Sequence, residues 1–228
     1  MAILVGIDGT GGDFTPGRAR NKRYDEAFAS SFVHRLCTPN SVDRQYFRGP
    51  VALGGGLAQA ISDGADFIVG RRKAGVTAPI LLTGYSRGAA GVVAMAAALK
   101  REKIKVHALL MFDCVDRHMF VDAETVPNNV EYVFHVVRNP DSRSRESFDN
   151  DGLRYRPPTN YGTAYSFMCT HGGMGGTPWV PAEGVDADEL IDEGGVDGKT
   201  KITYAEDAKV SKYIWNFVQP FVQKHGFI

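Results

Sequence analysis

The residues with the clearest chemical potential form the motif Gly84-Tyr85-Ser86-Arg87-Gly88. An apolar stretch precedes the motif and an alanine-rich stretch follows it, so the pattern predicts a serine on a sharp strand-to-helix turn. Such a turn exposes the hydroxyl of Ser86 above a sheet, where it can act as a nucleophile. Gly84 and Gly88 leave room for the turn, and the helix N-terminus favours negative charge that develops beside it. The alternative interpretation is a serine that only caps an ordinary helix.

A serine nucleophile needs a base and a carboxylate that orients the base. His171 is the predicted base, because it follows an apolar stretch and enters the glycine-rich segment 172–176, which can hold an imidazole over the sheet edge. His118 is the alternative base, and a turn histidine at the surface is the alternative interpretation of His171. His135 lies inside an apolar stretch and is interpreted as a core residue or a support for the site.

Three carboxylates are candidates for the orienting acid. Asp113 ends the apolar stretch after the Ser86 helix, Asp141 follows the next stretch, and Asp116 lies just beyond Asp113. The carboxyl ends of parallel strands meet at one edge of a sheet, so an acid after either strand can reach the histidine. Position in the chain therefore does not choose among the three.

The first apolar stretch ends in Asp8-Gly9-Thr10-Gly11-Gly12. In a parallel sheet this loop neighbours the serine turn, so we expect backbone N–H groups of Gly9, Thr10 and Arg87 to form an oxyanion hole. A phosphate-binding interpretation is weaker, because the loop lacks both the G-x-G-x-x-G spacing and the lysine of a P-loop.

These residues need a scaffold that brings strand ends together. The apolar, β-branched stretches predict strands over residues 2–7, 42–47, 78–83, 106–112, 130–137 and 164–169, and the intervening patterns predict helices over 24–36, 57–73, 88–103 and 205–224. Pro220 is expected to kink or shorten the last helix. Alternating strands and helices predict an α/β fold with a mostly parallel central sheet and helices on both faces. Segments 139–162 and 177–201 are expected to be irregular and to form no second core, so residues 1–228 are expected to form a single domain.

Composition narrows the class of protein. The 228 residues include 26 basic and 26 acidic side chains, and 43% are hydrophobic, which excludes intrinsic disorder and leaves no electrostatic footprint for nucleic acid. No apolar run approaches the ~20 residues of a membrane span, and the N-terminus lacks the basic region of a signal peptide. Cys37, Cys114 and Cys169 have no spacing typical of a zinc site or a disulfide framework. We therefore expect free or buried thiols, no metal, no cofactor and no nucleic-acid partner. The expected location is cytoplasmic as synthesised, with export by a non-classical route left open.

Several motifs together resemble the α/β-hydrolase domain of type VI secretion phospholipase effectors and their uncharacterised relatives. In chain order these motifs are Ile7-Asp8-Gly9-Thr10, Tyr46-Phe47-Arg48-Gly49-Pro50, Gly84-Tyr85-Ser86-Arg87-Gly88-Ala89, Phe112-Asp113-Cys114-Val115, His135 with Asp141 to Phe148, and His171-Gly172-Gly173-Met174-Gly175-Gly176. The resemblance spans residues 3 to 176 and implies Ser86 as nucleophile, Asp113 as acid and His171 as base. It also implies an α/β-hydrolase-like fold with a minimal lid or none.

This chain departs from the family pattern at points that concern the substrate. Cys114 stands where the family has threonine, Gly173 and Met174 stand where it has Asp-Val, and the chain has no room for the large membrane-binding insertions of the effectors. The expected function is a serine hydrolase of carboxylic esters, with lipid or phospholipid acyl esters as candidate substrates. A non-catalytic binding scaffold, or a thioesterase or acyltransferase with the same triad, is the alternative.

Charged and aromatic residues near these motifs have weaker interpretations. The acidic stretch 186–198 does not fit an EF-hand loop and is interpreted as a solvated loop. A set of arginines could recognise an anionic head group, although a solvated loop paired with neighbouring carboxylates is favoured. The set is Arg138, Arg143, Arg145, Arg154 and Arg156. Trp179 follows His171 and is expected either to line an acyl pocket or to cover the core.

Overall fold

Parallel strands form the centre of the fold in a computed structural model, which describes residues 2–11, 18–39, 41–51, 54–116, 121–148, 154–156, 159–161 and 164–228. The strands of this sheet are β1 (Ile3–Ile7), β2 (Arg44–Phe47), β3 (Ile80–Tyr85), β4 (Val106–Phe112), β6 (Val130–Arg138), β8 (Asn160–Tyr161) and β9 (Tyr165–Phe167). Their order is β2-β1-β3-β4-β6-β8, with β9 also paired to β6, and the pairings are parallel. The predicted parallel sheet is therefore confirmed.

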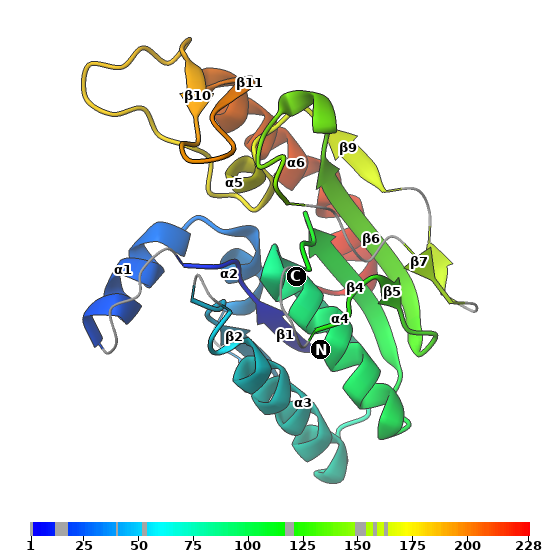
Figure 1. Cartoon of the computed structure of the whole chain (residues 1–228). Coiled ribbons are helices and arrows are strands. Elements are labelled where there is room, and N and C mark those ends of the chain that lie inside the picture. The colour runs from blue at the N-terminus through cyan, green and yellow to red at the C-terminus, as the bar shows by residue number, and fades with distance from the viewer. Residues whose placement is uncertain are drawn as a thin grey trace.

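Helices cover both faces of the sheet, as the sequence predicts. They are α1 (Arg18–Phe28), α2 (Phe32–Cys37), α3 (Leu57–Lys73), α4 (Arg87–Arg101), the short α5 (His171–Met174) and α6 (Tyr204–His225). Figure 1 shows α3 and α4 in front of the sheet and α6 behind it. The buried apolar side chains divide accordingly into one cluster beneath α3 and α4 and a second beneath α1, α2 and α6. The chain thus belongs to the α/β class.

Two predicted elements have the observed bounds, and others differ. Strand β4 and helix α3 begin and end where the sequence predicts. The single helix predicted over 24–36 is instead two helices, because the side chain of Ser31 caps a new helix by accepting a hydrogen bond from the N–H of His34 (3.4 Å). Helix α6 is not shortened at Pro220 but continues to His225.

The segments expected to be irregular contain short elements. Within 177–201 and just beyond it, β10 (Leu190–Asp192) and β11 (Lys199–Thr203) form an antiparallel hairpin. Within 139–162, the 3₁₀ turn η1 (Pro140–Ser142) follows β6, and β7 (Arg154–Tyr155) pairs with β5 (Thr125–Val126). The three cysteines are buried and free, as expected. Across the part of the chain that is described, no helix has the length and apolar character to cross a bilayer.

The strand order determines where a site can form. The chain passes from β1 to β2 on one side of β1 and then to β3 on its other side. The loops after β1 and β3 therefore diverge, which creates a crevice at the carboxyl ends of these two strands. Thr10 follows β1, Ser86 follows β3, and Asp113 follows β4, so three predicted site residues lie along this edge.

Candidate active site

Ser86 occupies the turn between β3 and α4 in a backbone conformation that is uncommon for residues other than glycine. Its φ is 56° and its ψ is −130°. The turn is held by the N–H of Ser86, which donates to the carbonyl of Phe112 (3.0 Å), and by the carbonyl of Ser86, which accepts from the N–H of Ala89 (3.0 Å). A Cβ on Gly84 would lie 2.6 Å from Cα of Ala89, which explains why glycine stands before this turn. Packing thus holds Ser86 in a strained conformation of the kind found at functional sites.

His171 begins the short helix α5, and its backbone is anchored from two sides. The preceding residue, Thr170, donates its N–H and its hydroxyl to the two carboxylate oxygens of Asp207 on α6, both at 2.8 Å. The hydroxyl of Tyr85, the last residue of β3, donates to the carbonyl of His171 (2.9 Å). The residue that carries the imidazole is therefore tied both to the sheet and to the C-terminal helix.

The side chains of Ser86, His171 and Asp113 form two consecutive hydrogen bonds. The Oγ of Ser86 lies 2.8 Å from Nε2 of His171, and Nδ1 of His171 lies 2.6 Å from Oδ2 of Asp113. An ionised carboxylate only accepts hydrogen bonds, so Nδ1 carries the imidazole proton and Nε2 is left to accept the proton of the Ser86 hydroxyl. The structure thus brings together the three residues expected as nucleophile, base and acid in the geometry of a Ser-His-Asp triad.

Asp113 is fully buried, and its surroundings keep it charged. Burial by itself raises the pKa of this carboxyl, but the hydrogen bond from His171 and the positive charge of Arg138 outweigh burial and lower the pKa to about 2. Nη1 of Arg138 donates to Oδ2 (2.7 Å), and the backbone N–H of Arg138 donates to Oδ1 (3.0 Å). Asp113 is therefore an anion at neutral pH and can stabilise an imidazolium at His171.

The structure describes both alternative acids but not the alternative base. Asp141 is exposed in η1, and Oδ2 of Asp116 accepts a hydrogen bond from the N–H of Ala123 (2.8 Å). His118 lies outside the described residues. His135 is buried within β6, where burial lowers its pKa to about 4.

Two of the three residues expected to form an oxyanion hole lie beside Ser86, and the third has its N–H bonded to another group. Thr10 and Arg87 line one cavity together with Ser86, and Arg87 is the first residue of α4. The N–H of Gly9, in contrast, donates to Oδ1 of Asp8 (2.9 Å). This corrects the role expected of Gly9, whose N–H is engaged in holding the loop after β1. Burial raises the pKa of Asp8 to about 7, against the opposing effect of its hydrogen bonds.

A cavity of about 350 Å³ opens in front of Ser86 and His171. Its apolar walls are Phe28, Tyr85, Val115, Phe148 and Trp179, and its polar walls include Thr10, Arg87, Arg145, Thr177 and Glu193. Trp179 therefore lines the cavity, one of the two positions expected from the sequence. The lining is typical of a small-molecule site, with mostly apolar and aromatic surface and a few polar groups.

The expectation of solvated arginine and acidic loops is wrong at the residues nearest the site. The Arg138 side chain is 5% exposed and pairs with Asp113, while Arg145 pairs with Glu193 and Asp197 of the acidic stretch. The side chains of Glu193 and Asp197 are 0% and 4% exposed. They can be buried because each meets a charge or N–H partner from a segment about 50 residues away in the chain, which local sequence does not reveal.

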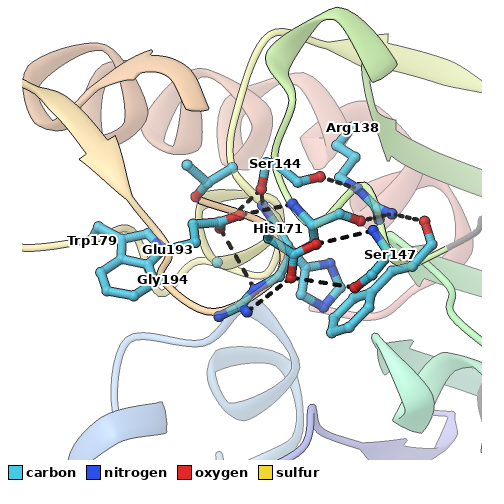
Figure 2. A network of polar contacts seen from close by, with 12 residues as sticks. Arg138, Ser144, Ser147, His171, Trp179, Glu193 and Gly194 are labelled. Atoms are coloured by element: carbon cyan, nitrogen blue, oxygen red, sulfur yellow. Dashed lines mark hydrogen bonds and ion pairs between the residues drawn. The ribbon is translucent and has the colours of Figure 1, made fainter. Parts of the chain in front are cut away.

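A polar network joins this acidic stretch to the candidate base (Figure 2). Oγ of Ser144 accepts a hydrogen bond from the N–H of His171 (2.8 Å) and donates to Oε1 of Glu193 (3.0 Å). Sequence reasoning did not identify Ser144, Glu193 or Asp207 as supports for His171, and no short-range pattern marks them. Within the described ranges, no group of three or more His, Cys, Asp or Glu side chains is arranged to hold a metal ion.

Comparison with known proteins gives no family. No protein-family model matches the chain, and no curated protein matches it. Among solved structures, the chain is similar to an uncharacterized protein from Pseudomonas aeruginosa, with 16% sequence identity and a TM-score of 0.44. This similarity covers 77% of the present chain and only 42% of the other, so the chain spans less than half the length of that protein. Function is therefore argued from the site itself.

Proposed function

We propose that the chain is a serine hydrolase that cleaves carboxylic esters through Ser86, His171 and Asp113. The observation that carries this proposal is the pair of hydrogen bonds that links Asp113, His171 and Ser86 at 2.6 and 2.8 Å, with Ser86 on a strained turn facing a cavity. A serine that only caps a helix would need neither the bonded imidazole nor the buried carboxylate behind it.

The first half of the reaction forms an acyl-enzyme. Oγ of Ser86 attacks the ester carbon while Nε2 of His171 takes the hydroxyl proton, and the anionic Asp113 stabilises the resulting imidazolium. The carbonyl oxygen becomes negative and accepts hydrogen bonds from the backbone N–H groups of Arg87 and Thr10, each of which lowers the barrier by about 3 kcal/mol. The imidazolium then gives its proton to the departing alkoxide, which leaves as an alcohol.

The second half restores the enzyme. A water molecule attacks the acyl carbon while Nε2 of His171 accepts one of its protons, and the tetrahedral intermediate collapses as Oγ of Ser86 leaves and takes that proton back. The products are a carboxylic acid and the free Ser86 hydroxyl.

The cavity supports an acyl ester as the substrate. Its aromatic walls, Phe28, Phe148 and Trp179 among them, favour an apolar acyl group through burial of apolar surface. The resemblance of the sequence to phospholipase effectors supports lipid and phospholipid acyl esters within this class.

The proposal is tested with a fluorophosphonate probe and a series of p-nitrophenyl esters of increasing acyl length. We expect covalent labelling at Ser86, located by peptide mass spectrometry, and hydrolysis that is lost in Ser86→Ala. Absence of both labelling and hydrolysis in the folded wild-type chain would instead support a non-catalytic binding scaffold. Faster product formation with added alcohol or with thioester substrates would move the activity to acyl transfer or thioester hydrolysis.

A further inference from the structure

Arg138, the last residue of β6, holds the candidate acid at two points. Its guanidinium donates to Oδ2 of Asp113 (2.7 Å), and its own backbone N–H donates to Oδ1 (3.0 Å). The Arg138 side chain is only 5% exposed, and that of Asp113 is 0% exposed. A buried charge pair of this kind fixes the orientation of the carboxylate because both oxygens have directed partners.

The remaining donors of the same guanidinium hold the loop after η1. Nε of Arg138 donates to the carbonyl of Ser144 (3.0 Å), and Nη2 donates to the carbonyls of Arg145 (3.2 Å) and Phe148 (2.5 Å). Arg145 and Phe148 line the cavity, and Ser144 accepts the N–H of His171 (Figure 2). One side chain therefore connects the acid, the backbone of the base and a wall of the cavity.

Arg138 and His171 also share one oxygen atom. Oδ2 of Asp113 lies 2.7 Å from Nη1 of Arg138 and 2.6 Å from Nδ1 of His171, so the two nitrogens lie within about 5 Å of each other. The carboxylate oxygen that orients the imidazole is therefore the same oxygen that the guanidinium holds, so the position of Arg138 sets the position of the acceptor for Nδ1 of His171.

We propose that Arg138 is a positioning residue for the candidate triad, which clamps Asp113 and the loop 144–148 in one arrangement. The role in catalysis rests on the proposed function, whereas the effect on the position of Asp113 does not.

Other charged groups around His171 have partners of their own. Arg145 pairs with Glu193 through their side chains, and Asp207 on α6 accepts two hydrogen bonds from Thr170. A substitution at Arg138 therefore acts first on Asp113 and on the carbonyls of the loop 144–148.

The first test compares kcat/KM for ester hydrolysis in wild type and Arg138→Met. We expect kcat/KM to fall at least tenfold, because Asp113 and the loop 144–148 lose the side chain that holds both. The matched control is Arg143→Met, which removes the same charge from a side chain that is 55% exposed and pairs with Glu146. The control should keep kcat/KM within about twofold of wild type. A folded Arg138→Met protein with wild-type kcat/KM would overturn the proposal.

A second variant keeps the positive charge and removes the planar fork. Arg138→Lys should also lower kcat/KM at least tenfold, because an ammonium cannot reach all the carbonyls of the loop. A wild-type kcat/KM in this variant would overturn the role of the planar guanidinium as a clamp. This variant also serves if Arg138→Met does not fold.

An NMR signal separates failure of this inference from failure of the proposed function. The Nδ1–H proton of His171, assigned with His171→Asn, can be observed without any substrate, and its hydrogen bond to Asp113 moves its signal downfield. We expect the downfield signal in wild type and in Arg143→Met, and its loss or upfield movement in Arg138→Met and Arg138→Lys. If the wild type neither hydrolyses esters nor reacts with a fluorophosphonate, the hydrolase proposal fails, and the NMR signal still decides whether Arg138 holds Asp113 against His171.

Discussion

Replacing Asp113 by asparagine changes the charge at the centre of the candidate site while keeping nearly the same side-chain volume. The carboxylate accepts three hydrogen bonds, two at Oδ2 from His171 and Arg138 and one at Oδ1 from the backbone N–H of Arg138. An asparagine has one acceptor end and one donor end. Whichever way its amide turns, the donor end faces an N–H group, so no orientation of Asp113→Asn reproduces the native contacts.

The structure allows the cost to be worked out for rate and for stability. When the asparagine amide donates to Nδ1 of His171, the imidazole proton must sit on Nε2. Nε2 then cannot accept the proton of Ser86. Loss of the correct tautomer lowers turnover ~10⁴-fold, which corresponds to a barrier higher by about 5.5 kcal/mol. The lowered pKa of Asp113, about 2 against an ordinary 3.8, means that its charge contributes on the order of 2 kcal/mol to folding at neutral pH. This contribution is present above pH ~4 and is lost as the pH falls toward 2. In Asp113→Asn the buried Arg138 also loses its carboxylate partner, which raises the loss in unfolding free energy toward ~3–5 kcal/mol.

The assay measures ester kcat/KM at the plateau pH together with urea unfolding of the same preparations. Asp113→Asn should lose about 10⁴-fold in kcat/KM and a few kcal/mol in unfolding free energy. The matched control is Asp141→Asn, an exposed carboxylate that lies after the next strand, and it should stay within about twofold of wild type. A folded Asp113→Asn protein with activity within tenfold of wild type, or a larger loss in Asp141→Asn, would refute the assignment of the acid.

Three further outcomes follow from the same geometry. Ser86→Ala should lose on the order of 10⁶-fold in kcat while unfolding at the same urea concentration as wild type, and retained turnover would exclude a serine mechanism. Asp8→Asn should unfold with a flatter pH dependence. The raised pKa of buried Asp8, about 7, costs wild type up to about 4 kcal/mol as the pH rises from 4 to 7, and a wild-type slope in the variant would contradict this. Gly88→Ala should destabilise the fold by about 1–3 kcal/mol, because the added Cβ would overlap the backbone carbonyls of Ile7 and Asp8, and unchanged urea unfolding would show that the serine turn tolerates a side chain there.

Local sequence was sufficient to predict the elements that carry the nucleophile. Strand β3 and helix α4 lie within two residues of the predicted bounds, and Ser86 lies on the predicted strand-to-helix turn between them. These features depend on runs of apolar residues, helical spacing and glycine positions, all of which act over a few residues. The division of the helix predicted over 24–36 depends instead on a single group, the capping side chain of Ser31.

The composition of the site beyond the nucleophile was decided by contacts between distant segments. Position in the chain left Asp113 and Asp141 as competing acids, and the strand order places Asp113 against Nδ1 of His171. Arg138 was interpreted as part of a solvated loop, yet it is buried because Asp113, 25 residues earlier in the chain, offsets the cost of removing its charge from water. Glu193 is buried for the same reason, through Ser144 and Arg145. Burial of a charge depends on the partner that the fold delivers, and short-range sequence patterns carry no information about that partner.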